Sequence, residues 1–353
     1  MTRSESDRIK DVRRLMDAAR AVAQRRASLV PVIVESTGLS TEGVELALSR
    51  HLEVDATDDD LAQLVTRAGD TSRVTVVLSA NVFVGALRAI AVARAASIDV
   101  VVRPSRRDPA FARALVEAAI AAGDAHLRID EDVDIATLDG GEVHVYGRDD
   151  TIADVRAKAS PGVRVLGHGS GMGVAWISAS ADLAEAARGL ASDVVVFDQR
   201  GCLSPRIALV HGDEARASAV ADALHAELDR LDVAIPRGAV PAEERAAAGR
   251  YVATMTYACR ALVGNHHAIG VAPPGAPIVL PPPYRNVHVA ACASPDEAVK
   301  LLEPLAKGIV TLGSDDAAAA RSIASAVVPR ARIAALGAMQ RPTLDGPVDL
   351  RET

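Results

Sequence analysis

Cys202 is the residue of this chain whose type and setting most strongly indicate chemistry. It lies in the segment DQRGCLSP, residues 198–205, just before the strand-like run Arg206–Val210. The flanking glycine and proline predict a thiol displayed on a loop. A thiol that can lose its proton is a nucleophile, so this position suggests acyl-group chemistry. Cys259 and Cys292 lie in periodic apolar surroundings and are expected to be small buried hydrophobes.

Two further features have weaker chemical signals. Glycines alternate at 167, 169, 171 and 173, but G-x-G-x-G-x-G differs from the dinucleotide fingerprint and a short strand is expected to follow. We favour close backbone packing over phosphate binding for this run. His168 could line a site, although a structural role is favoured. The pair His266-His267 has no second ligand pair at metal spacing, so it is expected on the surface or in a loop, and no metal is predicted.

Alternating strands and helices must position these residues. Strands are predicted at 73–78, 98–102, 142–146 and 163–166, with helices at 82–96, 108–122 and 149–159 between them. Short apolar strands alternating with helices indicate βαβ units and a parallel sheet. Ligands of such sheets bind at the carboxyl ends of the strands, where Asn81 and Arg103 stand.

The predicted fold class is α/β: a Rossmann-like parallel-sheet cofactor domain and a second α/β domain that bears the thiol. Helices are expected before the first sheet at 5–27, 41–51 and 57–68. The second unit is expected to contain helix 182–190, strand 206–210, helix 213–232, strands 276–280 and 287–291, helix 295–305, strand 308–312, helix 314–326 and strand 331–336. Proline-rich loops are expected at 272–277 and 281–283. We place the domains at 1–190, 191–320 and 321–353.

Composition limits the function classes. The 353 residues can bury a sizeable core, and a net charge of −7 gives no footprint for nucleic acid. The charged N-terminus is not a signal peptide, and no run of about 18 apolar residues predicts a membrane span. Three widely spaced cysteines suggest a reducing compartment, so a cytoplasmic location is expected.

Four motifs, in the right order and at compatible spacing, resemble the aldehyde dehydrogenase superfamily. More closely, they resemble the acyl-CoA reductase branch typified by bacterial bioluminescence fatty-acid reductases. The motifs are Leu78–Arg88 with Val100–Pro109, Tyr146-Gly147, Gly167–Gly173 and Asp198–Pro205. The tail Ile333–Asp349 is also similar to that branch, so the resemblance covers roughly residues 70–345.

The resemblance implies roles for particular residues. Cys202 would be the nucleophile, and the Asn81 side chain and the Cys202 backbone N–H would donate to the oxyanion. A nicotinamide cofactor would bind at Arg103, Ser105, Gly147, Arg148 and Gly167. Arg103 replaces the superfamily's usual lysine near the adenosine ribose. Because a guanidinium binds phosphate oxygens bidentately, Arg103 favours NADPH, and NADH stays open as the alternative cofactor.

Departures from the family pattern bear on the reaction. Hydrolytic aldehyde dehydrogenases carry a water-activating Glu at a position that matches Gly167 here. Without that base, hydrolysis of an acyl-enzyme is slow. The resemblance therefore implies NAD(P)H-dependent reduction of an acyl-CoA or acyl-carrier thioester to an aldehyde through a cysteine acyl-enzyme.

Two alternatives stay open. Arg148 replaces a family serine, and the ribose-binding Glu expected near Tyr284–Val287 is missing. These losses and the short chain also fit a non-catalytic paralogue that assembles with a partner enzyme. The other alternative is a hydrolytic aldehyde dehydrogenase, which the missing Glu opposes. A homo-oligomer is also left open.

Overall fold

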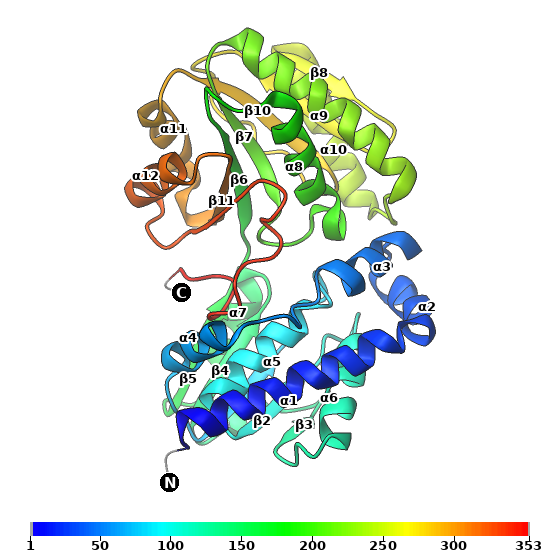
Figure 1. The fold of residues 1–353 in the computed structure, drawn as a ribbon, viewed down its shortest axis with the longest axis vertical. Coiled ribbons are helices and arrows are strands. Elements are labelled where there is room, and N and C mark those ends of the chain that lie inside the picture. Colours follow the sequence, from blue (N-terminus) through cyan, green and yellow to red (C-terminus); the bar gives the residue numbers. More distant parts are fainter. Residues whose placement is uncertain (1–2, 352–353) are drawn as a thin grey trace. The chain divides into compact units, whose positions relative to one another are not determined.

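The chain folds into two compact units, each built on its own sheet, in a computed structural model that describes residues 3–351 (Figure 1). Within that range, the first unit comprises residues 3–37, 44–170 and 343–351. The second unit comprises Gly38–Gly43 and Gly171–Pro342. The mixed α/β fold class is the one predicted.

The first unit contains a five-stranded parallel sheet in the order β3-β2-β1-β4-β5. Its strands are β1 Arg73–Val77, β2 Asp99–Arg103, β3 Leu127–Ile129, β4 Gly141–Tyr146 and β5 Val163–His168. Apolar runs such as Val74–Val77 are buried, as expected for strands covered on both faces. Four of these strands were predicted, and the three-residue β3 was not.

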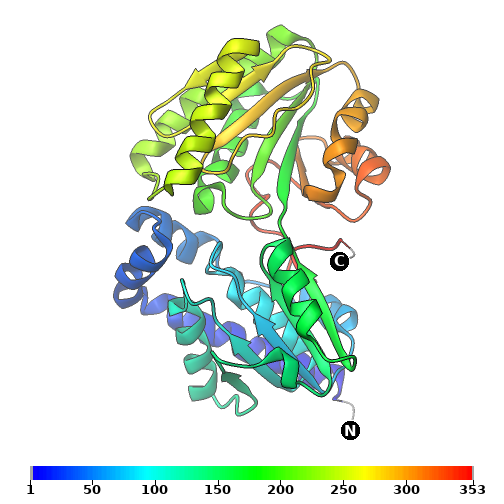
Figure 2. The same cartoon turned by 180° about the vertical axis from the view of Figure 1, so that it is seen from behind.

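Helices cover both faces of this sheet. The helices of residues 3–170 are α1 Glu5–Gln24, α2 Arg26–Thr37, α3 Thr41–Arg50, α4 Asp58–Ala68, α5 Gly85–Ala96, α6 Ala110–Ala121 and α7 Asp149–Lys158, with a short 3-10 turn η1 Ile135–Thr137. Thr57 caps α4 in a reciprocal capping box with Asp60. Figure 2 shows α7 lying over β5, which it contacts, while α5 packs against β1 and β2. The helix predicted at 5–27 is α1, which ends at Gln24, and α2, which begins after Arg25, was not predicted.

The second unit contains a seven-stranded sheet in the order β12-β11-β6-β7-β10-β9-β8. All neighbours are parallel except β8 and β9. The strands are β6 Met172–Ile177, β7 Pro205–His211, β8 Arg260–Val263, β9 Ala268–Ala272, β10 Asn286–Cys292, β11 Ile309–Ser314 and β12 Arg332–Ala334. The helices are α8 Leu183–Val195, α9 Glu214–Ala234, α10 Ala242–Ala258, α11 Pro295–Leu302 and α12 Ala317–Val327, with 3-10 turns η2 Val196–Gln199 and η3 Glu303–Gly308.

Two apolar clusters fill the second unit, one on each face of its sheet. Ala208 and Val210 of β7 pack with α8 and α9, whereas Ile207 and Leu209 pack with α11 and α12. This alternation along β7 is the period of two that a strand imposes. The sheet therefore holds β7, and the thiol loop before it, in a rigid setting.

Three further details differ from the sequence-based expectation. The strand predicted at 276–280 is wrong: β9 occupies the place beside β10, and residues 276–280 form no strand. Helix α10 was not predicted because it buries few apolar residues, Tyr251 and Met255. Residues 171–190 belong to the second unit rather than the first, because β6 lies between β11 and β7 in the larger sheet; residues 321–342 also belong there.

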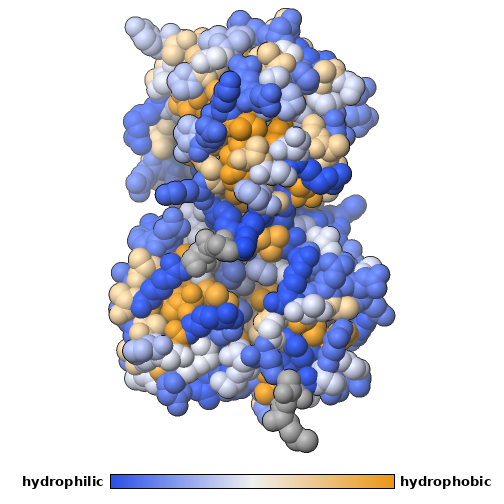
Figure 3. Space-filling model, turned by 90° about the vertical axis from the view of Figure 1, so that its left-hand side faces the viewer, coloured by the Kyte–Doolittle hydropathy of each residue, from blue (hydrophilic) through white to orange (hydrophobic). Residues whose placement is uncertain are grey.

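The surface carries few large apolar side chains. Figure 3 shows one face, on which hydrophilic side chains surround smaller hydrophobic patches. The most exposed large apolar residues among those described are Val233 and Tyr257. None of the helices described is both long and apolar enough to span a bilayer.

Candidate active site

The carboxyl edge of the first sheet gathers every predicted site residue except Cys202. Across this edge the strand register aligns Arg103 with Val77, Val77 with Val145, and Val145 with Gly167. Asn81, Ser105, Gly147 and Arg148 lie in the segments that follow β1, β2 and β4. This is the edge at which parallel sheets bind ligands. Cys202 belongs to the second unit, so it is described there.

Asn81 lies exposed in the bend between β1 and α5. Helix α5 begins at Gly85, and its N-cap is Val84, which makes no side-chain cap. Asn81 therefore does not cap this helix. The side chain makes no hydrogen bond to the residues described, so its amide N–H groups are available to a ligand.

Arg103 ends β2 and is half-buried. Its carbonyl oxygen accepts the Leu78 N–H at 3.0 Å, and its guanidinium forms no ion pair with any carboxylate in the described chain. Ser105 shapes the turn that follows, because its Oγ accepts the Arg107 N–H at 3.3 Å. Arg148 differs: it is largely exposed and pairs with Asp150 at 3.1 Å. Arg103 is thus a cation at the sheet edge with no carboxylate partner among the residues described.

Gly167 lies inside β5, beneath α7, rather than in a loop. A Cβ at this position would lie 2.6 Å from Ile152 Cγ2, and a Cβ at Gly169 would lie 2.4 Å from Asp149 Oδ1. The glycines therefore allow β5 and α7 to pack closely, as expected from their spacing. The Gly147 position is roomier, with Thr151 at ordinary contact distance. Cofactor contacts of Gly147 and Gly167 stay predictions.

His168 has a structural setting. Its ring stacks on Tyr146 with centroids 4.4 Å apart, and burial lowers the pKa of His168 to about 4. The neighbouring His144 Nε2 lies 2.9 Å from Glu142 Oε2. The favoured structural reading of His168 thus agrees with its packing.

Cys202 lies in a tight turn between η2 and β7 and is half-buried. The turn is closed by the Ser204 N–H, which donates to the Gly201 carbonyl at 3.0 Å. The thiol is in no disulfide. The predicted loop placement of Cys202 is therefore observed.

The backbone before the thiol is strained. Phe197, Asp198 and Gln199 have φ of 53°, 49° and 61°, although none is glycine. Such left-handed residues cost about 1–3 kcal/mol each and persist where surroundings enforce them. Gln199 supplies part of that enforcement: its Nε2 donates to the Pro205 and Asn286 carbonyls at 2.7 and 2.8 Å. It thus ties together both ends of the thiol loop.

Asp198 and Arg285 form a buried ion pair behind this turn. Arg285 Nε and Nη2 donate to Asp198 Oδ1 at 3.0 and 2.8 Å. The other oxygen of Asp198 accepts the Gly238 N–H at 2.9 Å. The sequence analysis identified Asp198 only as part of a motif and did not identify Arg285. No local sequence signal pairs two residues 87 positions apart.

A second set of contacts holds the loop from downstream. Gln340 Nε2 donates to Ser204 Oγ at 3.2 Å and to the Asp193 carbonyl at 3.3 Å. The Asp193 carboxyl accepts the N–H groups of Gly337 and Met339 at 2.6 and 3.0 Å. Burial raises the pKa of Asp193 to about 7, although these backbone N–H groups lower it in part. The tail motif thereby supports the loop.

The other candidate groups do not form chemical sites. Burial raises the pKa of the Cys292 thiol to about 12, which fits the buried hydrophobe predicted, whereas Cys259 is half-buried at the end of α10. His266 Nδ1 lies 2.7 Å from Asp232, and His267 Nε2 lies 2.8 Å from His225 Nδ1. Within residues 3–351, no group of three or more His, Cys, Asp or Glu side chains could hold a metal ion.

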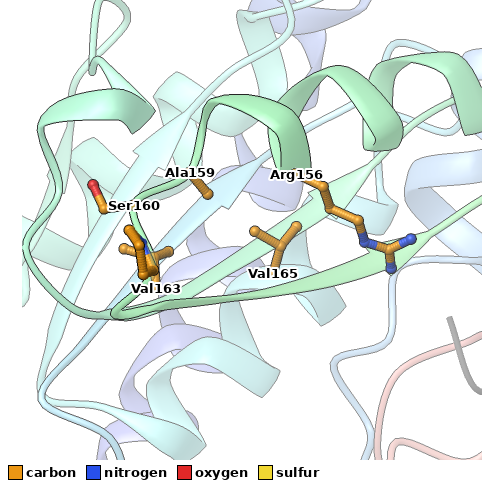
Figure 4. Close-up of a pocket in the computed structure, with 6 residues that line it drawn as sticks. Arg156, Ala159, Ser160, Val163 and Val165 are labelled. Atoms are coloured by element: carbon orange, nitrogen blue, oxygen red, sulfur yellow. The ribbon is translucent and has the colours of Figure 1, made fainter.

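A pocket of about 350 Å³ lies elsewhere, between the end of α7 and the edge strand β5. Figure 4 shows its lining residues, among them Arg156, Ser160, Val163 and Val165. Val163 is the first residue of β5, so the pocket reaches toward the edge opposite the carboxyl ends. It contains none of the predicted site residues and is not assigned a role.

We compared the chain with known protein families and with curated proteins. A family model described as acyl-CoA reductase (LuxC) matches residues 53–352. A comparison with curated proteins finds no match.

Solved structures share the fold. An NAD-dependent aldehyde dehydrogenase from Sinorhizobium meliloti superposes with a TM-score of 0.68 at 17% identity, covering 93% of this chain and 74% of that one. A salicylaldehyde dehydrogenase from Pseudomonas putida G7, complexed with salicylaldehyde, gives 0.69 at 14%, covering 99% and 79%. An oxidoreductase from Marinobacter aquaeolei gives 0.70 at 12%, covering 97% and 80%.

Proposed function

Because the chain belongs to the acyl-CoA reductase (LuxC) family, and is an oxidoreductase acting on aldehydes or acyl groups, we propose that it reduces an acyl thioester to an aldehyde with Cys202 as the nucleophile. The observation that carries the proposal is the thiol loop. A strained turn, held from both sides by buried polar side chains, presents a half-buried cysteine at the start of a central strand. Strain maintained in this way is typical of functional sites.

The protein's own residues account for the acyl-transfer step. The Cys202 thiolate attacks the thioester carbonyl, a carbon–sulfur bond to the enzyme forms, and the carrier leaves as a thiolate that takes up a proton. The tetrahedral oxyanion needs preorganised donors. The Cys202 backbone N–H and the unengaged Asn81 amide are the proposed ones.

Gly167 supports transfer over hydrolysis. It matches the position of the water-activating Glu in hydrolytic relatives, yet even a Cβ there would lie 2.6 Å from Ile152. A carboxylate could not be accommodated without a shift of the Ile152 side chain or of α7. The acyl-enzyme is therefore proposed to react by reduction rather than with water.

A nicotinamide cofactor fits the first unit's sheet edge. Its nucleotide part would be held by Arg103, with Ser105, Gly147, Arg148 and Gly167 nearby along the same edge. The uncompensated Arg103 favours a phosphorylated ribose, hence NADPH. When bound, the cofactor supplies the hydride that takes the acyl group to the aldehyde. The acyl donor is proposed to be acyl-CoA or an acyl carrier.

Replacing Cys202 by serine tests the nucleophile. A hydroxyl is a poor nucleophile without an activating base, so aldehyde formation from octanoyl-CoA and NADPH should be lost while the fold is kept. The measurement is aldehyde release, with circular dichroism to check folding. Cys259→Ser is the matched control and should retain activity. Residual activity of Cys202→Ser above about a tenth of wild type, a loss of only about 1.4 kcal/mol, would sink the assignment.

A further inference from the structure

Two backbone segments with unusual geometry meet beside the thiol loop. Within residues 3–351, every non-glycine residue with a positive φ belongs to one of them: Phe197–Gln199 or Tyr284–Arg285. The first segment precedes Cys202, and the second precedes β10. Clustering of all such residues around one loop points to a function rather than to accidents of folding.

The two segments contact one another residue by residue. The Arg200 guanidinium lies 6.0 Å from the centroid of the Tyr284 ring. Arg285 pairs with Asp198, and the Asn286 N–H donates to Gln199 Oε1 at 2.9 Å. We call these two segments, 197–200 and 284–286, the clamp. It joins the turn before the thiol to the start of the neighbouring strand β10.

The charged side chains at the centre of the clamp, Asp198 and Arg285, find their hydrogen-bond partners within the protein. The Asp198 and Arg285 side chains are 3% and 2% exposed. Both Asp198 oxygens accept hydrogen bonds, and Arg285 Nη1 donates further to the Ile235 carbonyl at 2.9 Å and pairs with Asp232 at 3.2 Å. Since no donor or acceptor of the pair points to an open surface, its role is to fix backbone rather than to bind substrate.

We propose that Asp198 and Arg285 are positioning residues for the reaction of Cys202. Their ion pair holds the left-handed turn at 197–199 and thereby sets the direction in which the thiol meets a thioester carbonyl. The inference rests on the proposed function of Cys202 as the acyl-accepting nucleophile. A small misplacement of a nucleophile can cost about a hundred-fold in rate.

The test separates orientation from thiol reactivity. In Asp198→Asn the side chain keeps its size but loses its charge, so the turn should loosen. The first-order rate of Cys202 acylation by saturating octanoyl-CoA, followed by intact mass after rapid quenching, should fall about ten- to a hundred-fold. The octanoyl-CoA concentration that gives half the maximal acylation rate should change by less than about threefold. The rate of Cys202 alkylation by iodoacetamide should also change by less than about threefold, because this reaction depends little on the orientation of the thiol. Arg285→Lys keeps one charged hydrogen bond and should recover part of the rate.

Asp124→Asn is the matched control. It breaks a second buried ion pair, Arg94 with Asp124 at 3.1 Å and 1% exposure of each, which lies in the first unit. Its acylation rate should stay near that of wild type. Equal acylation of wild type and Asp198→Asn would overturn the positioning role.

Other outcomes are also decisive. Wild-type protein that is alkylated but never acylated would refute the proposed function itself, and this inference with it. If Asp198→Asn does not fold, the acylation and alkylation rates of Arg285→Lys are compared with those of the wild type instead. If neither folds, the pair serves folding, and the positioning role is wrong.

Discussion

Asn81 combines three properties of an oxyanion donor: an amide side chain, a place at the carboxyl end of a central strand, and no hydrogen bond within the described chain. Replacing it by alanine should lower the rate of aldehyde formation by about 10²–10³, as removal of one such donor does elsewhere. Cofactor affinity should change little, because the amide acts on the reacting carbonyl. The measurement is kcat with parallel fluorescence titration of NADPH; a loss of NADPH binding instead would assign Asn81 to the cofactor or the fold.

Arg103 is the residue predicted to choose between the cofactors. Charge-assisted hydrogen bonds contribute about 1.5–3 kcal/mol, so Arg103→Leu should weaken NADPH binding roughly ten- to a hundred-fold. NADH affinity should be nearly unchanged, since NADH has no 2′-phosphate. Arg148→Leu is a useful comparison because Arg148 already has a carboxylate partner, Asp150. Titration of each variant with both cofactors decides: equal weakening would place Arg103 at the shared ribose or diphosphate.

At the scale of residues, the side chains that could react were easier to predict from the sequence than the residues that hold them in place. The loop setting of Cys202 and the strand-end settings of Asn81 and Arg103 follow from local patterns of apolar and turn residues. Arg285 has no such pattern, because its partner Asp198 is 87 positions away and the pairing exists only once β10 lies beside β7. The same holds for Gln340 and Ser204, which are 136 positions apart.

At the scale of elements, Gly167 decides how closely α7 approaches β5. Gly167→Ala would place a methyl group 2.6 Å from Ile152 Cγ2, so it should destabilise the protein by about 1–3 kcal/mol. Urea unfolding followed by circular dichroism measures the free energy of unfolding, and hydrogen exchange of β5 locates the change. Gly85→Ala, where the nearest atom is 3.8 Å away, should stay within about 0.5 kcal/mol.

The origin of the Gly167 effect can be checked with a second substitution. In an Ile152→Ala background the clashing atoms are gone, so the cost of Gly167→Ala should shrink. An undiminished cost would mean that the methyl group is opposed by something other than Ile152, and that the explanation by Ile152 packing is wrong.

Elements with a regular apolar period were predicted, and those without one were missed. Within residues 73–168, the four predicted strands and three predicted helices form, because β1, β2 and β4 are buried apolar strands and each of the three helices has an apolar face. Helix α10 buries only Tyr251 and Met255 of its apolar residues, and the short antiparallel β8 is partly exposed, so neither has a clear pattern. The false strand at 276–280 has apolar residues of the right type, but proline-containing loops flank it and β10 has already paired with β9.

At the scale of the whole molecule, buried titratable groups predict how stability changes with pH. In the second unit, burial lowers the pKa of His267 and His288 to about 4, and raises that of Asp193 to about 7. The two histidines stay neutral in the fold, so their contribution to stability is present above about pH 6.5 and is lost as the pH falls toward 4. Asp193 acts oppositely: its contribution is present below about pH 3.8 and is lost as the pH rises through 7.

These opposed signs give a sharp prediction for Asp193→Asn. Between about pH 4 and 6.5, the histidines bind two more protons on unfolding and Asp193 releases one, so wild-type stability should rise by about 1.4 kcal/mol per pH unit. Removing the carboxyl should about double that slope. Trp176, the single tryptophan, is buried in β6 and reports unfolding of this unit by fluorescence in urea. If the free energy of unfolding changes with pH at the same slope in both proteins, Asp193 is ionised in the folded protein over this whole pH range. The Gly337 and Met339 N–H groups would then outweigh burial in setting its pKa.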